Sequence, residues 1–164
     1  MENEKESLRV FIVDDDPVFS KAMETYLLNT FKDVEIQCFT NGEACLHELH
    51  KEPDLILLDY KLDSEFAYAW DGLQVLKKIN SLNPGLSVVV MSAKESVETA
   101  MDCINQGAMD YVLKNEKVFE KVKQILMELK VEIEEVNQGE DQGKMPGLLG
   151  ILILLLLVIF LFLR

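Results

Sequence analysis

Basic residues are few in this sequence. Its 164 residues include 16 Lys and Arg against 29 Asp and Glu, and the formal net charge is −13. A protein that binds the phosphate backbone of a nucleic acid needs clustered Lys and Arg side chains. The charge balance therefore predicts no nucleic-acid partner.

The sequence also lacks the features of a secreted protein. Its three cysteines, Cys38, Cys45 and Cys103, have no C-x-x-C spacing, which argues against a disulfide framework or a thiolate zinc site. The first ten residues lack the basic segment and the long apolar run of a secretory signal. We therefore expect reduced, mostly buried thiols and a chain that stays largely in the cytosol.

Between residues 8 and 135, short apolar runs alternate with helical patterns. This alternation is typical of βα units and of a parallel sheet. Five such units in about 130 residues predict one α/β domain with a doubly wound, five-stranded parallel sheet, whose ligand site lies at the carboxyl ends of the strands. The predicted strands are residues 8–13, 34–39, 55–58, 86–91 and 111–113.

Helices are predicted between the strands and after the last one. Asp16 is a candidate N-cap and Pro17 a candidate first residue of the first helix. Further helices are predicted at 41–51, 72–82 and 95–106, and a fifth from about residue 115 to 136. One face of the first helix should pack on the sheet: Phe19, Ala22, Met23, Tyr26 and Leu27. The stripe of the fifth contains Val118, Val122, Ile125, Leu126 and Leu129.

The end of this fifth helix extends beyond the length that the sheet needs. Ile133 and Val136 prolong its apolar stripe. The extension is compatible with a stiff spacer or with a short coiled-coil seam, and about two heptads do not decide between a monomer and a dimer.

Acidic residues follow two of the predicted strands. Asp14, Asp15 and Asp16 follow the first strand, and Asp59 follows the third. Because the carboxyl ends of parallel strands meet at one edge, at least three carboxylates should converge there. Their mutual repulsion calls for a hard cation, and an open site with few carboxylates suits Mg²⁺ better than Ca²⁺. The alternative is a capped turn, which we prefer for Asp16 alone.

Two further polar residues are predicted at the same edge. Ser92 follows the fourth strand and Lys114 follows the fifth. Carboxylates, a hydroxyl and a lysine together can form a site for a phosphoryl group. The metal and the lysine neutralise the phosphoryl oxygens, while one carboxylate acts as the nucleophile.

From about residue 8 to residue 129, the sequence resembles the receiver domain of two-component response regulators. The resemblance implies a flavodoxin-like sheet of strand order 2-1-3-4-5. It also implies a signalling protein whose only chemistry is self-catalysed phosphoryl transfer and autodephosphorylation. The matching segments, in the order of the family, are FIVDDDP, DLILLD, DGLQVL, VVVMSAK and DYVLK.

This resemblance also implies the roles of the site residues. Asp59 would accept the phosphoryl group. Mg²⁺ would be bound directly by Asp15 and mainly through water by Asp14, and Asp59 and the main-chain carbonyl of Lys61 would complete the metal site. Lys114 would contact the phosphoryl group.

Two more residues would form a conformational switch. The resemblance implies that the hydroxyl of Ser92 moves towards the phosphoryl group and frees space for the ring of Tyr111 to turn inward. Tyr111 can also be an ordinary edge residue, with its ring in the core and its hydroxyl in water.

The sequence departs from the family pattern in two places. Asp71-Gly72 follows Asp59 about five residues later than is usual, and the inserted stretch contains Phe66, Tyr68 and Trp70. These aromatics could form a docking element or could fold back over the third helix, and we slightly favour packing. In addition, Asn115 follows Lys114 where the family usually has a proline in a cis peptide bond. A cis bond without proline costs about 2.5–4 kcal/mol, so we expect a trans loop with Lys114 slightly displaced.

The C-terminal segment has a different composition. Residues 147–163 contain no polar side chain, and Arg164 ends the sequence. At ~1.5 Å per residue this segment spans about 25 Å, at the short end for a hydrocarbon core of about 30 Å. We therefore expect a receiver domain at 1–135, an acidic flexible linker at 136–146 and a transmembrane tail anchor at 147–164.

Taken together, these patterns predict a single-domain response regulator held at a membrane by its C-terminus, with the receiver in the cytoplasm. Its partners would be a histidine kinase or a phosphotransfer protein and an effector at the membrane. Two alternatives stay open: a degenerate receiver that docks partners without phosphoryl chemistry, and a phosphate sink that drains a kinase.

Overall fold

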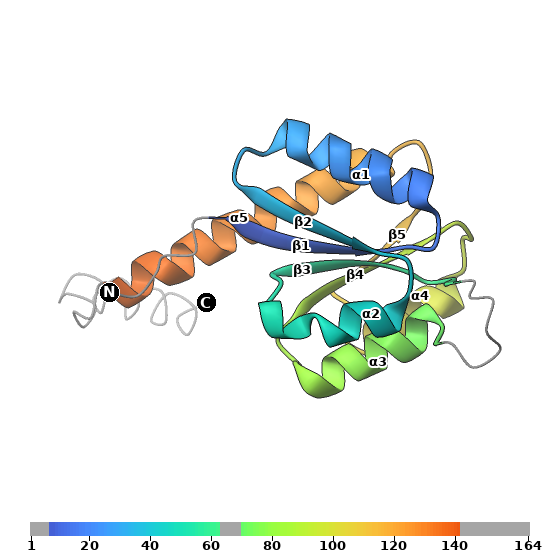
Figure 1. Ribbon diagram of the computed structural model, residues 1–164. Helices are drawn as coiled ribbons and strands as arrows, with labels where there is room; N and C mark the ends of the chain where they lie inside the picture. Colours follow the sequence, from blue (N-terminus) through green and yellow to red (C-terminus); the bar gives the residue numbers. More distant parts are fainter. Residues whose placement is uncertain (1–6, 63–69, 142–164) are drawn as a thin grey trace, which may run out of the picture. The chain divides into compact units, whose positions relative to one another are not determined.

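A five-stranded parallel sheet forms the centre of the fold (Figure 1). The computed structural model describes residues 7–62 and 70–141. The strand order is β2-β1-β3-β4-β5, as the resemblance implied. The strands are β1 (Leu8–Val13), β2 (Val34–Phe39), β3 (Leu55–Asp59), β4 (Ser87–Ser92) and β5 (Asp110–Leu113).

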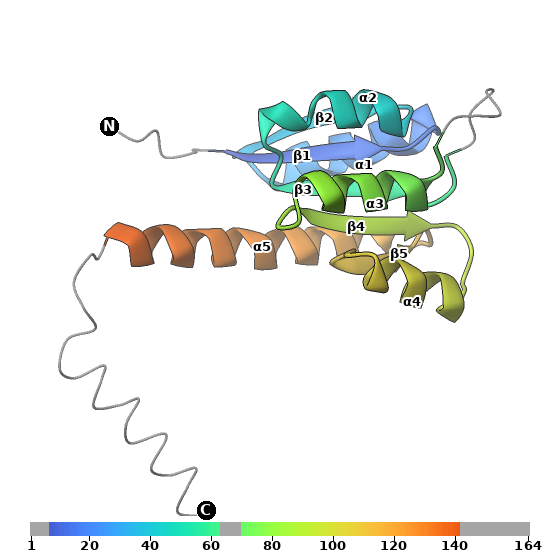
Figure 2. The same cartoon turned by 90° about the horizontal axis from the view of Figure 1, so that it is seen from below.

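Helices cover both faces of this sheet. In Figures 1 and 2, α1 and the beginning of α5 lie on one face, whereas α2, α3 and α4 lie on the other. This arrangement confirms the predicted α/β doubly wound fold. The helices are α1 (Pro17–Thr30), α2 (Gly42–His47), the short 3₁₀ helix η1 (Leu49–Lys51), α3 (Gly72–Leu82), α4 (Val97–Asn105) and α5 (Val118–Asp141).

The chain divides into two units. The first contains residues 1–125 and includes the sheet, the first four α-helices and the beginning of α5. The second contains residues 126–164, of which the structure describes the continuation of α5 to Asp141. The site described below lies entirely within the first unit.

The three central strands supply most of the core. All five residues of β3 are buried, and so are the last four residues of β1 and the last five of β4. Strands that are covered on both faces have nearly continuous apolar sequences, which explains the runs IV, LILL and VVVM. Their carboxyl ends place Asp14, Asp59 and Ser92 at one edge of the sheet.

The buried face of α1 differs from the prediction. Ser20, Met23 and Leu27 are buried, whereas Ala22 is exposed. The prediction is therefore confirmed for Met23 and Leu27 and wrong for Ala22, while Phe19 and Tyr26 are half-buried. Both rings pack against Phe119 at the beginning of α5.

The predicted helix at 41–51 consists of two pieces. Helix α2 ends at His47, a 3₁₀ turn follows, and Glu52 has a left-handed conformation with φ of 54°. Pro53 comes next in the sequence and disfavours a helical conformation for the residue before it. The helical segment therefore ends at Lys51.

The helices α4 and α5 begin later than predicted. Ser96 caps α4 by accepting a hydrogen bond from the Thr99 amide, so that helix starts at Val97. Before α5, the side chain of Asn115 accepts a hydrogen bond from the Lys117 amide, and this local turn competes with a helical start at residue 115.

The end of α5 corrects the predicted boundary of the linker. Residues 136–141, which we assigned to the flexible linker at 136–146, continue the helix. An existing helix adds residues without a new nucleation cost, and Gly139 costs only about 1 kcal/mol relative to alanine. Proline would stop the helix more firmly, but the first proline after α5 begins is Pro146.

The predicted transmembrane anchor at 147–164 lies outside the described residues. Among the helices that the structure describes, none is long and apolar enough to cross a membrane.

Candidate functional site

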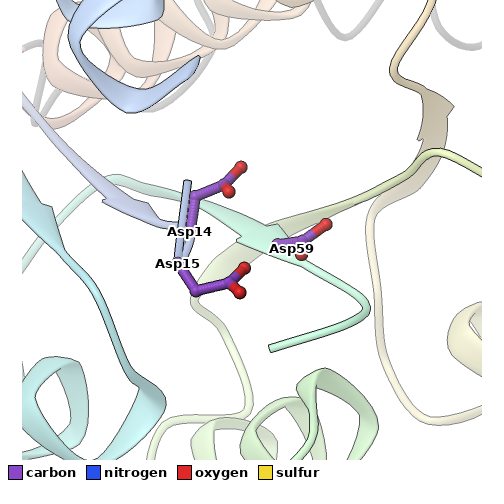
Figure 3. A group of neighbouring side chains, drawn as sticks. All are labelled: Asp14, Asp15 and Asp59. Atoms are coloured by element: carbon purple, nitrogen blue, oxygen red, sulfur yellow. The ribbon is translucent and has the colours of Figure 1, made fainter. Parts of the chain in front are cut away.

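Three carboxylates converge at the carboxyl edge of the sheet, as the sequence predicted. Asp14 and Asp15 follow β1, and Asp59 is the last residue of β3 (Figure 3). One oxygen of each carboxylate lies within 4.8 Å of the oxygens of the other two. Asp14 and Asp59 are buried, with 1% and 5% of their surface exposed, whereas Asp15 is half-buried.

The turn after β1 fixes the orientation of Asp14. Its Oδ1 accepts a hydrogen bond of 3.1 Å from the Asp16 amide, and its main-chain amide donates to the carbonyl of Phe39 at the end of β2. The Oδ2 atom is buried and accepts no hydrogen bond of good geometry, but the ammonium of Lys114 lies 2.6 Å away. This oxygen therefore depends on a nearby cation.

Asp16 is the N-cap of α1, as expected. It is exposed, and its Oδ1 accepts hydrogen bonds from the amides of Val18 and Phe19 in the first turn of α1. This N-cap begins the helix directly beside the cluster. Asp16 is not part of the group of three carboxylates that could bind a metal.

The chain turns sharply after Asp59. The amide of Tyr60 donates to the carbonyl of Met91, and the amide of Gly72 donates to the carbonyl of Tyr60. A Cβ atom at Gly72 would lie 2.2 Å from the carbonyl oxygen of Asp59 and 2.7 Å from that of Tyr60. Glycine is therefore required where α3 begins, despite the longer connection from Asp59.

Lys114 extends from the end of β5 into the cluster. Its Nζ lies 2.6 Å from Oδ2 of Asp14 and 2.8 Å from Oδ1 of Asp59. We expected the loop after Lys114 to be trans, and the described part of the chain contains no cis peptide bond. With this trans loop the ammonium reaches both carboxylates.

Burial dominates the electrostatics of this cluster. Desolvation raises the pKa of Asp14, although the Lys114 ammonium partly offsets the increase. Desolvation also raises the pKa of Asp59 to about 6, again against the effect of Lys114. For Lys114, burial alone would lower the pKa, but its close ion pairs with the carboxylates of Asp14 and Asp59 raise it overall. The ammonium therefore stays charged, and Asp59 is ionised at neutral pH.

The donor set fits a small, hard divalent cation. Mg²⁺ prefers oxygen ligands, and this site offers three carboxylate oxygens close to one another, two of them in buried side chains. Because the protein supplies only a few ligands, water can occupy the remaining coordination positions. Lys114 supplies one positive charge against three carboxylates, which leaves a net negative site. The residues present therefore match a Mg²⁺ site formed by Asp14, Asp15 and Asp59.

Ser92 and Tyr111 share an acceptor in the loop after β4. The Ser92 hydroxyl donates to the main-chain carbonyl of Lys94 at 3.3 Å and accepts from the Lys94 amide at 3.2 Å. The Tyr111 hydroxyl donates to the same carbonyl at 2.9 Å. Ser92 is buried at the edge of the sheet, and the ring of Tyr111 is half-buried against the core. The structure thus connects the two predicted switch residues through one carbonyl group.

The remaining predicted residues are Lys61 and the three aromatic residues of the insertion. Lys61 follows Asp59 by two residues and is exposed. Phe66 and Tyr68 lie outside the described residues. Trp70 packs partly buried against the core, and its amide donates to Glu43 at 3.0 Å. For Trp70, the packing interpretation is therefore confirmed.

One residue at the site was not predicted as a site residue. The ring of Phe19 faces the ammonium of Lys114, whose Nζ lies 4.7 Å from the ring centroid. From the sequence, Phe19 is expected only on the packed face of the first helix. Its position three residues after the N-cap, in the helical turn next to the acidic cluster, was the signal that could have indicated this contact.

Comparisons with known proteins agree with this geometry. The family described as "Response regulator receiver domain" matches residues 10–126. Among curated proteins, the regulatory protein AtoC of Escherichia coli is 34% identical over 110 residues, which is 65% of this chain and 22% of AtoC. The probable C4-dicarboxylate response regulator DctR of Bacillus subtilis is 30% identical over 148 residues, 87% of this chain and 62% of DctR.

The fold also matches solved structures. A CheY-like response regulator receiver domain protein of Methanospirillum hungatei superposes with a TM-score of 0.66 and 25% identity, and the match covers 79% of this chain and 98% of that one. By contrast, the chain spans only 22–23% of the length of the first curated relatives that it matches.

Proposed function

The chain belongs to the response regulator receiver domain family, and on that premise we propose that Asp59 accepts a phosphoryl group in a Mg²⁺-dependent reaction. Receiver domains are phosphorylated by histidine kinases or phosphotransfer proteins, and we propose such a protein as the donor. The observation that carries the proposal is the position of the Lys114 ammonium between Asp14 and Asp59, beside a third carboxylate.

The proposed transfer needs an ionised nucleophile and charge neutralisation. One carboxylate oxygen of Asp59 forms a bond to phosphorus while the P–N bond of the phosphohistidine donor breaks. The leaving imidazole keeps the electron pair of that bond and takes up a proton. A pKa of about 6 leaves Asp59 ionised at neutral pH, so the nucleophile is available.

Positive charge around the phosphoryl group comes from two sources in this proposal. The Lys114 ammonium already contacts Asp59, so a small movement brings it to a phosphoryl oxygen. Mg²⁺, when held by Asp14, Asp15 and Asp59 with the main-chain carbonyl of Lys61, would supply further charge against the phosphoryl oxygens.

The shared carbonyl of Lys94 suggests how phosphorylation changes the surface. When the Ser92 hydroxyl turns to a phosphoryl oxygen, it leaves that carbonyl, and the loop after β4 loses one of its anchors. The Tyr111 hydroxyl bonds to the same carbonyl, so a shift of this loop changes the contact that holds the ring. We propose that Tyr111 then turns inward and that a partner recognises the altered surface of α4 and β5.

Phosphorylation of the purified full chain tests this function. The protein, solubilised in mild detergent, is incubated with acetyl phosphate and Mg²⁺ and its intact mass is measured. We expect one added phosphoryl group that is stable in acid and lost in hydroxylamine, and none in Asp59→Asn. The control Asp54→Asn changes another aspartate of the same chain and keeps the label. Equal labelling of Asp59→Asn would contradict the assignment of the acceptor.

We also propose that residues 147–164 hold the receiver at the cytoplasmic side of a membrane. The support is the sequence: no polar side chain precedes Arg164 in this segment, and its length approaches that of a hydrocarbon core. The full chain should remain with membranes after washing with high salt or alkali, because salt releases only electrostatic attachment. Deletion of 147–164 should release the protein and leave Asp59 phosphorylation near normal. A truncated chain that stays with the membranes would contradict this anchor.

A further inference from the structure

Lys114 has three neighbours that determine the position of its ammonium. Two are the carboxylates of Asp14 and Asp59, and the third is the ring face of Phe19, 4.7 Å from Nζ. The side chain is only 14% exposed, so the ammonium has lost much of its water. A cation above an aromatic face is attracted by the ring quadrupole, and desolvation strengthens that attraction.

Phosphorylation alters one of these neighbours and leaves the ring unchanged. The Asp59 carboxylate becomes an acyl phosphate, so its charge and geometry change, and the ammonium has to move to a phosphoryl oxygen. Phe19 is uncharged and takes no part in that reaction. It can therefore guide the ammonium both before and after transfer.

Phe19 is itself held firmly in place. It lies in the first turn of α1, where its amide donates to the N-cap Asp16 at 3.2 Å. Its ring packs against the ring of Phe119 with 6.0 Å between centroids. Phe119 packs edge-on against Tyr26 at 5.3 Å, and the Tyr26 hydroxyl donates to Glu120 at 2.8 Å. This aromatic cluster joins α1 to the beginning of α5.

The backbone fixes where the Lys114 side chain begins but not where its ammonium lies. The Lys114 amide donates to the Ser92 carbonyl at 2.7 Å, and the Asn115 amide donates to the Leu113 carbonyl at 2.9 Å. Beyond the backbone, lysine has a long side chain with much rotamer entropy to lose. A contact near the ammonium limits this freedom where the chemistry occurs.

From these contacts we propose that Phe19 is a positioning residue for Lys114. Its ring holds the ammonium within reach of Asp59 and of the phosphoryl group that Asp59 accepts. This inference rests on the proposed phosphoryl transfer for its kinetic consequence, but its geometric basis can be measured separately.

The kinetic test compares variants of the full chain in detergent, with acetyl phosphate and saturating Mg²⁺. Phe19→Leu keeps an apolar side chain but removes the ring, and we expect the phosphorylation rate to fall about threefold to tenfold. Phe19→Tyr keeps the ring face and should stay within about twofold of the wild type. The control Phe31→Leu makes the same substitution at the other end of α1 and should leave the rate unchanged.

A double-mutant cycle separates positioning from a general structural effect. If Phe19 acts through Lys114, Phe19→Leu should have little further effect in the Lys114→Met background. An equal loss in both backgrounds would overturn the proposal, and so would an unchanged rate for Phe19→Leu alone.

An NMR measurement on the unphosphorylated protein provides an independent readout. Protons above a ring face are shifted upfield, so the Lys114 Hε signals should be upfield in the wild type and in Phe19→Tyr and should return to ordinary positions in Phe19→Leu. The absence of that shift in the wild type would refute the contact whether or not Asp59 is phosphorylated. A wild type with the shift but without any label would instead refute the proposed function.

Discussion

Replacing the acceptor Asp59 with asparagine should stabilise the metal-free protein. Asp59 is 5% exposed, and burial raises its pKa from 3.8 to about 6 despite the favourable contact with Lys114. At about 1.4 kcal/mol per pH unit, this increase corresponds to about 3 kcal/mol against folding when the carboxylate is charged. Because the edge of the sheet is open to solvent, screening reduces this cost, and we expect Asp59→Asn to gain between about 1 and 3 kcal/mol at pH 8.

The stability difference between Asp59→Asn and the wild type should depend on pH. Between pH 6 and 3.8 the folded state binds a proton at Asp59 that the unfolded state does not bind. The stability of the wild type therefore rises as the pH falls through this window. The asparagine variant lacks this proton, so its advantage should be largest near pH 8 and should disappear by about pH 4.

Urea unfolding with EDTA at pH 8, 6 and 4 measures this difference. We expect the midpoint of Asp59→Asn at pH 8 to lie roughly 1 M urea above that of the wild type. The control Asp16→Asn also removes one charge beside the cluster, but this residue is exposed and asparagine keeps the N-cap, so its stability should change by less than about 1 kcal/mol. Mg²⁺ should narrow the gap at pH 8 because it binds the folded wild type preferentially. The reasoning would be refuted by an asparagine variant that is less stable than the wild type at pH 8, or by a difference that does not depend on pH.

Three further predictions concern the same edge of the sheet. Asp15→Asn should weaken Mg²⁺ binding at least about tenfold in calorimetry, whereas Asp16→Asn should not, because only Asp15 belongs to the carboxylate cluster; equal losses would contradict the assignment. Lys114→Met removes the ammonium that contacts Asp59, so a ¹³C NMR titration should show the pKa of Asp59 above about 6, with Lys121→Met as an exposed control that leaves it unchanged. Gly72→Ala places a Cβ 2.2 Å from the Asp59 carbonyl oxygen and should lower the free energy of unfolding in urea by about 1–3 kcal/mol. The control Gly85→Ala, whose Cβ would have nothing within 4 Å, should lower it by less than about 1 kcal/mol. Similar losses at the two positions would contradict the close approach at Gly72.

Much of the fold could be predicted from the sequence because buried strands can be seen there as short apolar runs. Strands covered on both faces are continuous apolar runs, so the central strands β1, β3 and β4 were predicted within one residue of their observed bounds. The edge strands β2 and β5 are less buried, and their bounds were also predicted within one residue. Helix ends were less predictable, since they depend on local side-chain bonds. The bond between Asn115 and the Lys117 amide delays α5, and Glu52 before Pro53 ends the preceding helical segment.

The residues that form the site could be predicted from the sequence, but several of the contacts between them could not. Residues at the ends of parallel strands meet at one edge whatever their neighbours, so Asp14, Asp59 and Lys114 follow from the strand assignment alone. Contacts made by the loops do not follow from it. The Lys94 carbonyl that serves both Ser92 and Tyr111 depends on the path of the loop after β4. The contact of Phe19 with Lys114 depends on the position of α1 relative to the loop after β5, which an apolar pattern within the helix does not give.

Direct mapping of the phosphoryl group is the decisive measurement for this account. The phosphorylated full chain is reduced with borohydride, which converts an aspartyl phosphate to homoserine, and its peptides are sequenced by mass spectrometry. We predict homoserine at position 59, formed only when the phosphodonor and Mg²⁺ are both present. Homoserine at Asp14 or Asp15 instead, or no homoserine from a folded protein under these conditions, would contradict the account.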